Sequence, residues 1–373
     1  MSDDLHSRIL GCMVGSAIGD AFGGPVEFLS GEELEALTGK CWVDEFLPYP
    51  VEREPHPLGI WSAGAARGTG TDDTRNNHIF AECVIRNRGI VDSHLLAIEY
   101  IQRYRDRELF YSDHVELAER QYRWMHERSC AYLGMRELPS GAPAWAVSAY
   151  GSGRPTLVGL ISLAFAGLLY QEEPEQAYVK AFELSFLDLG YARDATAMMA
   201  AMVSAALGGG VSGREMVNIG LETNPFGLGE TVFAPRVLVE EIGELLQLCS
   251  GLDDDKALID ALAHEVASHH PYDPIDILGV PMAAIHHCDG DPVRSIIMAA
   301  NDRGLTDDGG LAGLRDVDCT AGVAGALVGA LHGVEAFPQD WVADAMGANR
   351  ETYGIDLAEN ASRFCEAVYG ANS

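Results

Sequence analysis

Late in the chain stands the stretch Asp316-Val317-Asp318-Cys319-Thr320-Ala321-Gly322-Val323-Ala324-Gly325-Ala326-Leu327-Val328-Gly329-Ala330, two acidic residues followed by a run of small apolar ones. Gly325 and Gly329, with Gly333 beyond them, recur at four-residue spacing, which places them on one face of a helix. We interpret this spacing as close packing between buried helices. The apolar run around 321–331 falls short of the roughly 20 residues that a membrane-spanning helix needs, so we expect no membrane association.

A second acidic cluster, Thr71-Asp72-Asp73-Thr74, follows the turn-rich stretch 67–70 far earlier in the chain. The two clusters together offer four carboxylates with neighbouring hydroxyls, an oxygen-rich set that suits Mg²⁺ or Mn²⁺ better than zinc. If they converge, the chain carries a metal centre with two ions and is an enzyme. Acidic residues at helix starts also serve as caps that favour the helix dipole. Either cluster alone fits that structural role equally well.

The N-terminal segment adds a third part. Gly11, Gly15 and Gly19 share one face of a predicted helix, where the absence of side chains lets another backbone approach. Asp20 falls near the end of that helix, and Glu27 lies in the turn that follows. Taken alone, the glycines indicate a tightly packed core helix and nothing more.

Composition excludes several classes of function. The chain has 373 residues, of which 47% are apolar and 22% are charged, as in a soluble globular protein. Its formal charge of −31 argues against general binding to nucleic acid or anionic membranes, which requires basic surfaces. The eight cysteines contain no CxxC pair, and the acidic N-terminus precedes no signal-type apolar segment. We therefore expect reduced thiols and a cytoplasmic protein.

Helical periodicity dominates the chain. We expect helices beginning at Asp92 or Ser93 and ending near Arg105, over 238–249 with Pro235 in the first turn, and over 156–170, 175–187 and 192–207. Short extended pieces are expected near 43–47, and loops at 47–70, 134–156 and 224–235, where glycine and proline cluster. Because acidic clusters from both ends would form one site, a single mostly helical domain over 1–373 is favoured.

Other polar groups receive simpler interpretations. The pairs His269-His270 and His286-His287 lack a convincing second set of ligands, so we interpret them as surface or core histidines. Asp307-Asp308-Gly309-Gly310 is most simply an acidic turn, although its closeness to Asp316 allows a supporting role. The three aspartates at 253–255 are expected in a solvated loop.

Together, the three segments resemble the ADP-ribosylglycohydrolase family, which includes the dinitrogenase-reductase-activating glycohydrolase and the ADP-ribosyl-acceptor hydrolases. Members show an N-terminal GxxxGxAxGDAxG, a TDDT near residue 70 and a late DxD[TC] that runs into a helix of small residues. This chain has all three in order, at 11–23, 71–74 and 316–319. Pro338 and Trp341 also resemble the usual ending of the family, so the likeness spans most of the chain.

The resemblance implies an all-α fold, a compact single-domain helical bundle with a cleft that holds two Mg²⁺ or Mn²⁺ ions. Glu27 is similar to an acidic residue that reaches the metals and gates the substrate, and we assign Glu27 and Asp73 as catalytic carboxylates. Asp20 would brace the N-terminal loop. Gly153 and Arg154, in a glycine-rich stretch, would contact the ribose or phosphates of the substrate. The implied metal ligands are Thr71, Asp72, Asp73, Asp316 and Asp318.

Two departures from the family pattern concern the site. Cys319 stands where many members have a threonine ligand, and a thiol is a poor ligand for Mg²⁺ but more tolerable for Mn²⁺. Thr320 offers a hydroxyl, but one position along a helix rotates it by about 100°. The segment 184–196 lacks the Thr-His often found midway in the family, so we expect different substrate contacts there.

The resemblance therefore implies a metal-dependent hydrolase that cleaves the glycosidic bond of ADP-ribosyl or related ribosyl conjugates. Its partner would be an ADP-ribosylated protein or a small ADP-ribosyl conjugate. Two alternatives stay open at this point: a non-catalytic, crystallin-like member with the same fold, or a metal hydrolase of another nucleoside or ribosyl substrate. The sequence indicates neither the acceptor group, nor Mg²⁺ over Mn²⁺, nor an oligomeric state.

Overall fold

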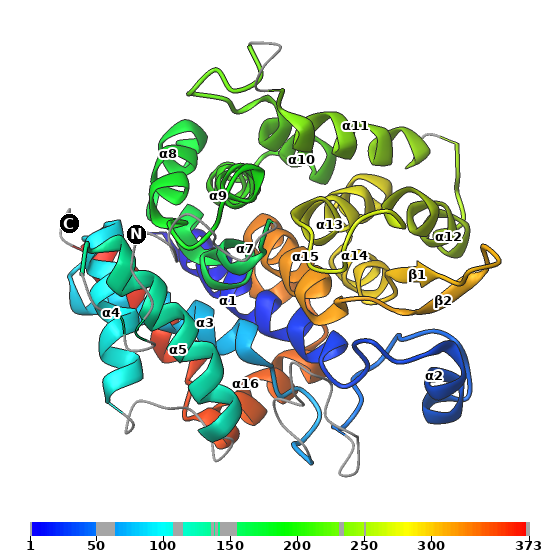
Figure 1. Cartoon of the computed structure of the whole chain (residues 1–373), viewed down its shortest axis with the longest axis horizontal. Helices are drawn as coiled ribbons and strands as arrows, with labels where there is room; N and C mark the ends of the chain where they lie inside the picture. Colours follow the sequence, from blue (N-terminus) through cyan, green and yellow to red (C-terminus); the bar gives the residue numbers. More distant parts are fainter. Residues whose placement is uncertain are drawn as a thin grey trace.

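The computed structural model describes residues 2–49, 64–106, 115–135, 138, 141, 155–230, 235–249 and 251–370. Helices supply nearly all of the regular structure in these ranges, as Figure 1 shows, and the predicted all-α class is confirmed. Within the described part of the chain, every helix is too short or too polar to cross a bilayer. The α-helices are α1 Asp3–Gly23, α2 Gly31–Thr38, α3 Asp72–Arg86, α4 Ser93–Arg105, α5 Val115–Tyr132, α7 Val158–Ser162, α8 Pro174–Leu184, α9 Tyr191–Leu207, α10 Gly213–Glu222, α11 Val237–Cys249, α12 Asp255–Val266, α13 Pro274–Cys288, α14 Pro292–Ala299, α15 Val317–His332, α16 Gln339–Tyr353 and α17 Leu357–Tyr369.

Two antiparallel helices, α1 and α15, lie side by side through the middle of the molecule (Figure 1, blue and orange). Their contact is made by backbone rather than by side chains. A β-carbon added to Gly11 or Gly15 would lie within 3.0 Å of the backbone of Gly329 or Gly325, and the reverse substitutions meet the same overlap. The four-residue glycine spacing in both segments therefore reflects one shared contact, and the predicted close packing is confirmed.

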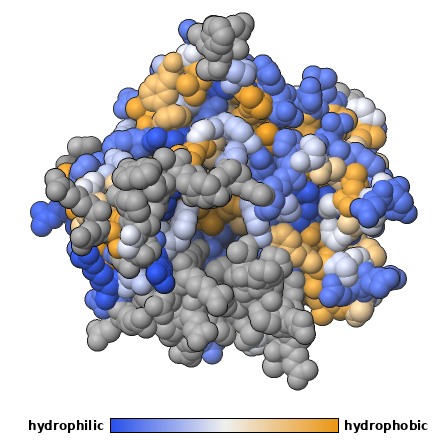
Figure 2. Space-filling model, viewed as in Figure 1, coloured by the Kyte–Doolittle hydropathy of each residue, from blue (hydrophilic) through white to orange (hydrophobic). Residues whose placement is uncertain are grey.

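The remaining helices surround this pair (Figure 1). Helices α13 and α14 pack against α15, helices α3, α16 and α17 pack against α1, and α9 contacts both. One hydrophobic cluster includes buried side chains from Leu5 near the N-terminus to Cys365 near the C-terminus. On the outside, hydrophilic side chains cover much of the face shown in Figure 2, which is hollowed near its centre.

Most predicted helices are confirmed, with two corrections. The segment 156–170 is not one helix, because α7 ends at Ser162 and a 3₁₀ helix, Ala164–Leu169, follows. The side-chain oxygen of Asn77 accepts a hydrogen bond from the Ala164 backbone N–H at 3.0 Å, replacing the carbonyl partner that a continuing helix would supply. Pro235 lies before α11 rather than in its first turn, since the helix begins at Val237.

The strands lie elsewhere than expected. Residues 43–47 form no strand, because the side chain of Asn301 bonds both the N–H and the carbonyl of Val43, at 2.9 and 2.7 Å. Instead, β1 (Arg303–Leu305) pairs antiparallel with β2 (Leu311–Leu314) in a hairpin. The acidic stretch 307–310 forms the turn between them, as predicted.

Replacing Gly15 with alanine tests the backbone contact. The new methyl group overlaps the Gly325 backbone, so we expect the free energy of unfolding to fall by about 3 kcal/mol. Gly243→Ala in α11 is the matched control, because nothing lies within 4 Å of its added β-carbon. It should gain roughly 0.5–1 kcal/mol from helix propensity. Denaturant unfolding of both variants measures the difference, and equal stabilities would contradict close packing at this contact.

Candidate metal centre

The contact between α1 and α15 brings the turn after α1 beside the segment before α15. The Leu314 N–H donates to the Leu29 carbonyl at 2.9 Å, and the Phe28 N–H donates to the Arg315 carbonyl at 3.2 Å. Glu27 on one segment and Asp316 on the other immediately adjoin these bonds. The backbone pairing therefore fixes two carboxylates from opposite ends of the chain next to each other.

The backbone at Phe28, directly after Glu27, adopts a positive φ of 57°. A residue with a β-carbon in this left-handed region costs roughly 1–2 kcal/mol. Such strain persists where the surroundings determine the conformation, and it is concentrated at functional sites. Here the hydrogen bond to Arg315 and an edge-to-face contact with Tyr272, with ring centroids 5.7 Å apart, hold the turn that carries Glu27.

Asp20 fixes the start of α3 from the end of α1. Its carboxylate accepts hydrogen bonds from the backbone N–H of Thr71 and of Thr74, each at 2.9 Å, and from the Thr74 hydroxyl at 2.5 Å. The Thr71 hydroxyl accepts a bond from the Asp73 N–H at 3.2 Å. Asp20 thus braces the TDDT segment rather than the N-terminal loop that the resemblance implied.

Carboxylates from the three motifs meet in one buried cluster. Two groups of ligand atoms each lie within 4.8 Å of one another: Asp73, Asp318 and Cys319 form one group, and Glu27, Asp316 and Asp318 form the other. Asp318 belongs to both, so the two groups adjoin. Each of these side chains is at most 7% exposed. The clusters predicted to converge from distant parts of the sequence do so in the structure.

Burial and mutual repulsion dominate the electrostatics of the cluster. Burial, followed by the charges of neighbouring carboxylates such as Asp318, raises the pKa of Glu27, Asp73 and Asp316 well above the usual range. Burial and Asp318 also raise the pKa of Asp20 to about 7, despite its hydrogen bonds. These carboxyls therefore hold their protons more tightly than ordinary carboxyls do, unless positive charge enters the cluster.

The capping alternative applies in part to each cluster, since Asp318 Oδ1 accepts a hydrogen bond from the Cys319 N–H in the first turn of α15, at 2.9 Å. Thr71 is the N-cap of α3, and its hydroxyl makes the capping bond. Asp316 precedes α15, but its side chain makes no capping hydrogen bond. The Thr320 hydroxyl donates a hydrogen bond to the Ala299 carbonyl at 2.9 Å, and this bond orients it toward α14. Cys319, whose sulfur joins the carboxylate cluster, is the better placed of the two residues.

Three further predicted positions are less tightly defined. Asp72, 8% exposed, belongs to neither ligand group, although it lies close enough to raise the pKa of Glu27 and Asp73. Gly153 and Arg154, the predicted substrate contacts, lie outside the described residues. Their roles stay predictions.

A buried charge cluster that sequence reasoning missed holds Arg315, the residue directly before Asp316. The Arg315 Nε atom lies 2.6 Å from Asp276 and 3.6 Å from Asp302, and its Nη2 donates to the His269 carbonyl at 3.0 Å. Burial raises the pKa of Asp302 to about 6 and that of Asp276 well above its usual range. No local pattern relates these residues, because they come from three separate segments.

The loop before α3 is also held by residues without a sequence signal. Asn349 of α16 accepts a bond from the Gly70 N–H at 3.0 Å and donates to the Gly68 carbonyl at 3.1 Å. The Tyr353 hydroxyl donates to the Gly70 carbonyl at 2.8 Å. The guanidinium of Arg75 lies over the Tyr353 ring, 5.2 Å from its centroid, and its Nε donates to the Thr71 carbonyl at 3.1 Å.

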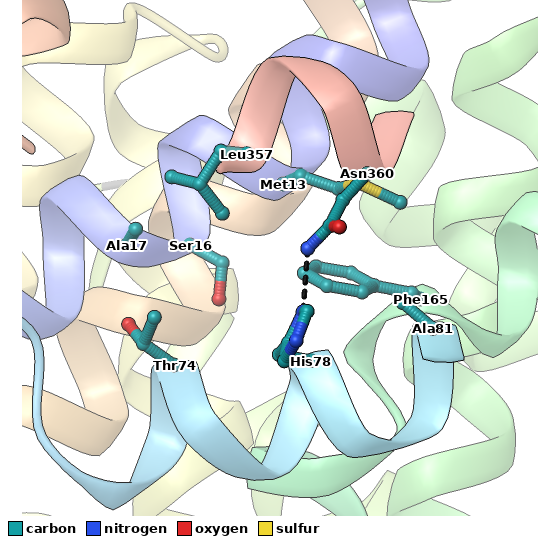
Figure 3. A pocket seen from close by; sticks show the side chains of 9 residues that line it. All are labelled: Met13, Ser16, Ala17, Thr74, His78, Ala81, Phe165, Leu357 and Asn360. Atoms are coloured by element: carbon teal, nitrogen blue, oxygen red, sulfur yellow. Dashed lines mark hydrogen bonds between the residues drawn. The ribbon is translucent and has the colours of Figure 1, made fainter. Parts of the chain in front are cut away.

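A small cavity lies beside Thr74, the α3 residue whose hydroxyl donates to Asp20 (Figure 3). Residues of α1, α3, the 3₁₀ helix and α17 line it, among them Ser16, Thr74, His78 and Asn360. His78 points toward Asn360 and is hydrogen-bonded to it, and burial lowers its pKa to about 3, so the ring is neutral. A volume of about 10 Å³ holds one water molecule at most. The cavity is therefore no substrate site.

The donor set fits divalent cations. Its two ligand groups contain carboxylates and one thiol, and carboxylates are the hard oxygen ligands that Mg²⁺ and Mn²⁺ prefer. The Thr71 hydroxyl, bonded to the Asp73 N–H, would add one more oxygen. The Thr71 oxygen accepts one hydrogen bond and keeps a second lone pair for a ligand. Bound cations would offset the repulsion that raises the pKa values of the cluster.

Comparisons with known proteins agree with this arrangement. Residues 1–371 match the family model described as ADP-ribosylglycohydrolase. An Archaeoglobus fulgidus protein named only as uncharacterized is 26% identical over 356 residues, or 91% of each chain. The uncharacterized protein YegU of Escherichia coli K12 is 34% identical over 89 residues, or 24% of each chain.

A solved structure titled "ADP-ribosylglycohydrolase-related protein complex" shares the fold, with a TM-score of 0.58 at 20% identity. The match covers 98% of this chain and 100% of that one. The family match over nearly the whole length and the shared fold confirm the family that the three motifs indicated. The chain belongs to the ADP-ribosylglycohydrolase family.

Proposed function

We propose that this protein is a metal-dependent hydrolase that releases ADP-ribose, or a related ribosyl group, from a conjugate. The convergence of Glu27, Asp73, Asp316 and Asp318 in one buried cluster carries the proposal. Thr71, Asp72, Asp73, Asp316 and Asp318 would hold two Mg²⁺ or Mn²⁺ ions, with Asp318 shared between them. In a non-catalytic protein, mutually repelling carboxylates at this position would only lower the stability of the fold, because their burial destabilises it.

The chain's own residues supply the remaining chemistry. Bound divalent ions would polarise water and orient the ribose hydroxyls. Glu27 and Asp73 are the carboxylates we assign to accept the proton of the attacking water. As the bond between the anomeric carbon and the acceptor nitrogen or oxygen breaks, negative carboxylates stabilise the oxocarbenium-like transition state. Water adds to the anomeric carbon, and the departing nitrogen or oxygen takes up the proton that the carboxylate accepted. The strained turn at Phe28 keeps the Glu27 carboxylate beside Asp318 during this step.

Cys319 favours Mn²⁺ over Mg²⁺ at one of the two positions. Its sulfur lies with the carboxylates of Asp73 and Asp318. A sulfur ligand is tolerated better by Mn²⁺ than by the harder Mg²⁺. The substrate partner would be an ADP-ribosylated protein or a small ADP-ribosyl conjugate. The single domain over 1–373 and the cytoplasmic location stay predictions.

Asp318→Asn tests the proposed function most simply. The change removes the carboxylate common to both ligand groups, so we expect a loss of about a thousandfold in kcat/KM, as when several kcal/mol of transition-state stabilisation disappear. Asp253→Asn, an equal change of charge at an exposed position, should keep wild-type activity.

Release of ADP-ribose would be measured with Mg²⁺ and with Mn²⁺ on conjugates of arginine, serine, an acetyl ester and nucleic acid. Wild-type protein that turns over none of these conjugates would contradict the proposal. Full activity of Asp318→Asn would contradict the assigned site. A nucleoside or other ribosyl substrate cleaved instead would identify the alternative hydrolase.

The raised pKa values predict pH-dependent stabilisation by metal. Without metal, the folded chain keeps protons on Asp20, Glu27, Asp73 and Asp316 that the unfolded chain releases from about pH 4. The stability of the metal-free protein therefore falls as the pH rises through about 7, the pKa of Asp20. Because metal competes with these protons, it should stabilise the fold more at higher pH.

Thermal unfolding with and without Mn²⁺, at about pH 5 and about pH 7.5, measures this effect. An ion present at one hundred times its Kd raises the free energy of unfolding by about 2.7 kcal/mol. At one fixed Mn²⁺ concentration, we expect most of that gain only at the higher pH. Asp318→Asn should lose the gain, whereas Asp253→Asn should retain it. Equal stabilisation at both pH values would show that the buried carboxyls do not bind the ion.

A further inference from the structure

The hydroxyl of Tyr49 is buried beside the metal centre without a hydrogen-bond partner. The side chain is 3% exposed, and no atom of the described residues accepts a hydrogen bond from its hydroxyl oxygen or donates one to it. A buried, unpaired hydroxyl costs roughly 1–3 kcal/mol. Groups of this kind in native structures call for an explanation, and one explanation is an absent ligand.

The surroundings show where this hydroxyl points. A β-carbon added to Gly24, at the end of α1, would overlap both the Tyr49 hydroxyl and the methyl group of Thr71. The hydroxyl therefore lies between the C-terminus of α1 and the N-cap of α3. The carboxylates of Asp20, Asp318 and Glu27 are close enough to act on it electrostatically.

The tyrosine is also held in place by its backbone. The Tyr49 N–H donates to the Ala65 carbonyl at 3.2 Å, which joins Tyr49 to the segment that leads into α3. Gly24 leaves the space that the hydroxyl occupies. The side chain is thus positioned from both ends, by a backbone bond at its base and by a glycine at its tip.

We propose that Tyr49 donates a hydrogen bond to a water molecule bound at the metal centre. The proposal rests on the proposed metal-dependent function and adds a ligand contact that the acidic motifs do not contain. Asp20, Glu27, Asp73 and Asp318 offer oxygens that accept hydrogen bonds when ionised, whereas a neutral phenol donates one. Tyr49 would therefore orient the oxygen that the carboxylates and ions hold.

Tyr49→Phe removes the hydroxyl and keeps the ring. If the hydroxyl has no protein partner, the metal-free variant should melt at the wild-type temperature or higher. If it donates to an ion-bound water, the Kd for Mn²⁺ should rise roughly tenfold, as for other partners of metal-bound groups. A hydroxyl with a purely structural role would give the opposite pair of results.

Tyr369→Phe is the matched control, because its hydroxyl donates to the Leu168 carbonyl at 2.7 Å in a part-buried position on α17. It should melt at a lower temperature and bind Mn²⁺ as the wild type does. Thermal unfolding of the metal-free proteins and Mn²⁺ titration followed by electron paramagnetic resonance give the two readouts.

Three results decide the matter. A raised Kd for Mn²⁺ in Tyr49→Phe, with unreduced metal-free stability, supports the proposal. An unchanged Kd together with a lower melting temperature overturns it and leaves the proposed metal centre intact. A wild-type protein that binds no Mn²⁺ overturns both the contact and the metal-dependent function.

Discussion

Helices α1 and α15 contact each other through backbone atoms at Gly11, Gly15, Gly325 and Gly329, and the positions of the site carboxylates follow from that contact. Any larger residue at these points would separate the helices or slide one along the other. A slide by one turn, about 5.4 Å, exceeds the 4.8 Å within which the ligand atoms of each group gather. The glycines therefore affect the site indirectly, because they fix the register of the two helices and with it the positions of the carboxylates.

Bonds next to the acidic motifs explain how the protein tolerates a carboxylate cluster that opposes folding. Asp20 accepts hydrogen bonds from the N–H of Thr71, just before α3, and of Thr74, in its first turn. Two buried aspartates, Asp276 and Asp302, hold Arg315, the residue before Asp316. These bonds hold the backbone of each acidic motif, so the repelling carboxylates do not have to hold it themselves. The protein thus keeps the ligands in place at some cost in stability, which bound cations would recover.

The parts of the site that the sequence predicts are those with a local signal. Glycines at four-residue spacing and paired aspartates are each recognisable within a few residues, and the structure brings them together. Asn349, Tyr49 and the Asp276–Arg315 pair carry no such signal, because the residues that lie beside them in the fold come from distant segments. The break after Ser162 was missed for the same reason, since a side chain from α3 takes the bond that would continue the helix.

We propose that two cations bind on either side of Asp318, in a cluster whose geometry the glycine contact determines. Crystals grown with Mn²⁺, with diffraction data collected at the manganese absorption edge, would locate these cations. We expect two anomalous peaks in contact with the Asp318 carboxylate, one toward Asp73 and Cys319 and the other toward Glu27 and Asp316. A map with no peak at this carboxylate, or with manganese bound only elsewhere, would show that the carboxylate cluster is not the metal site.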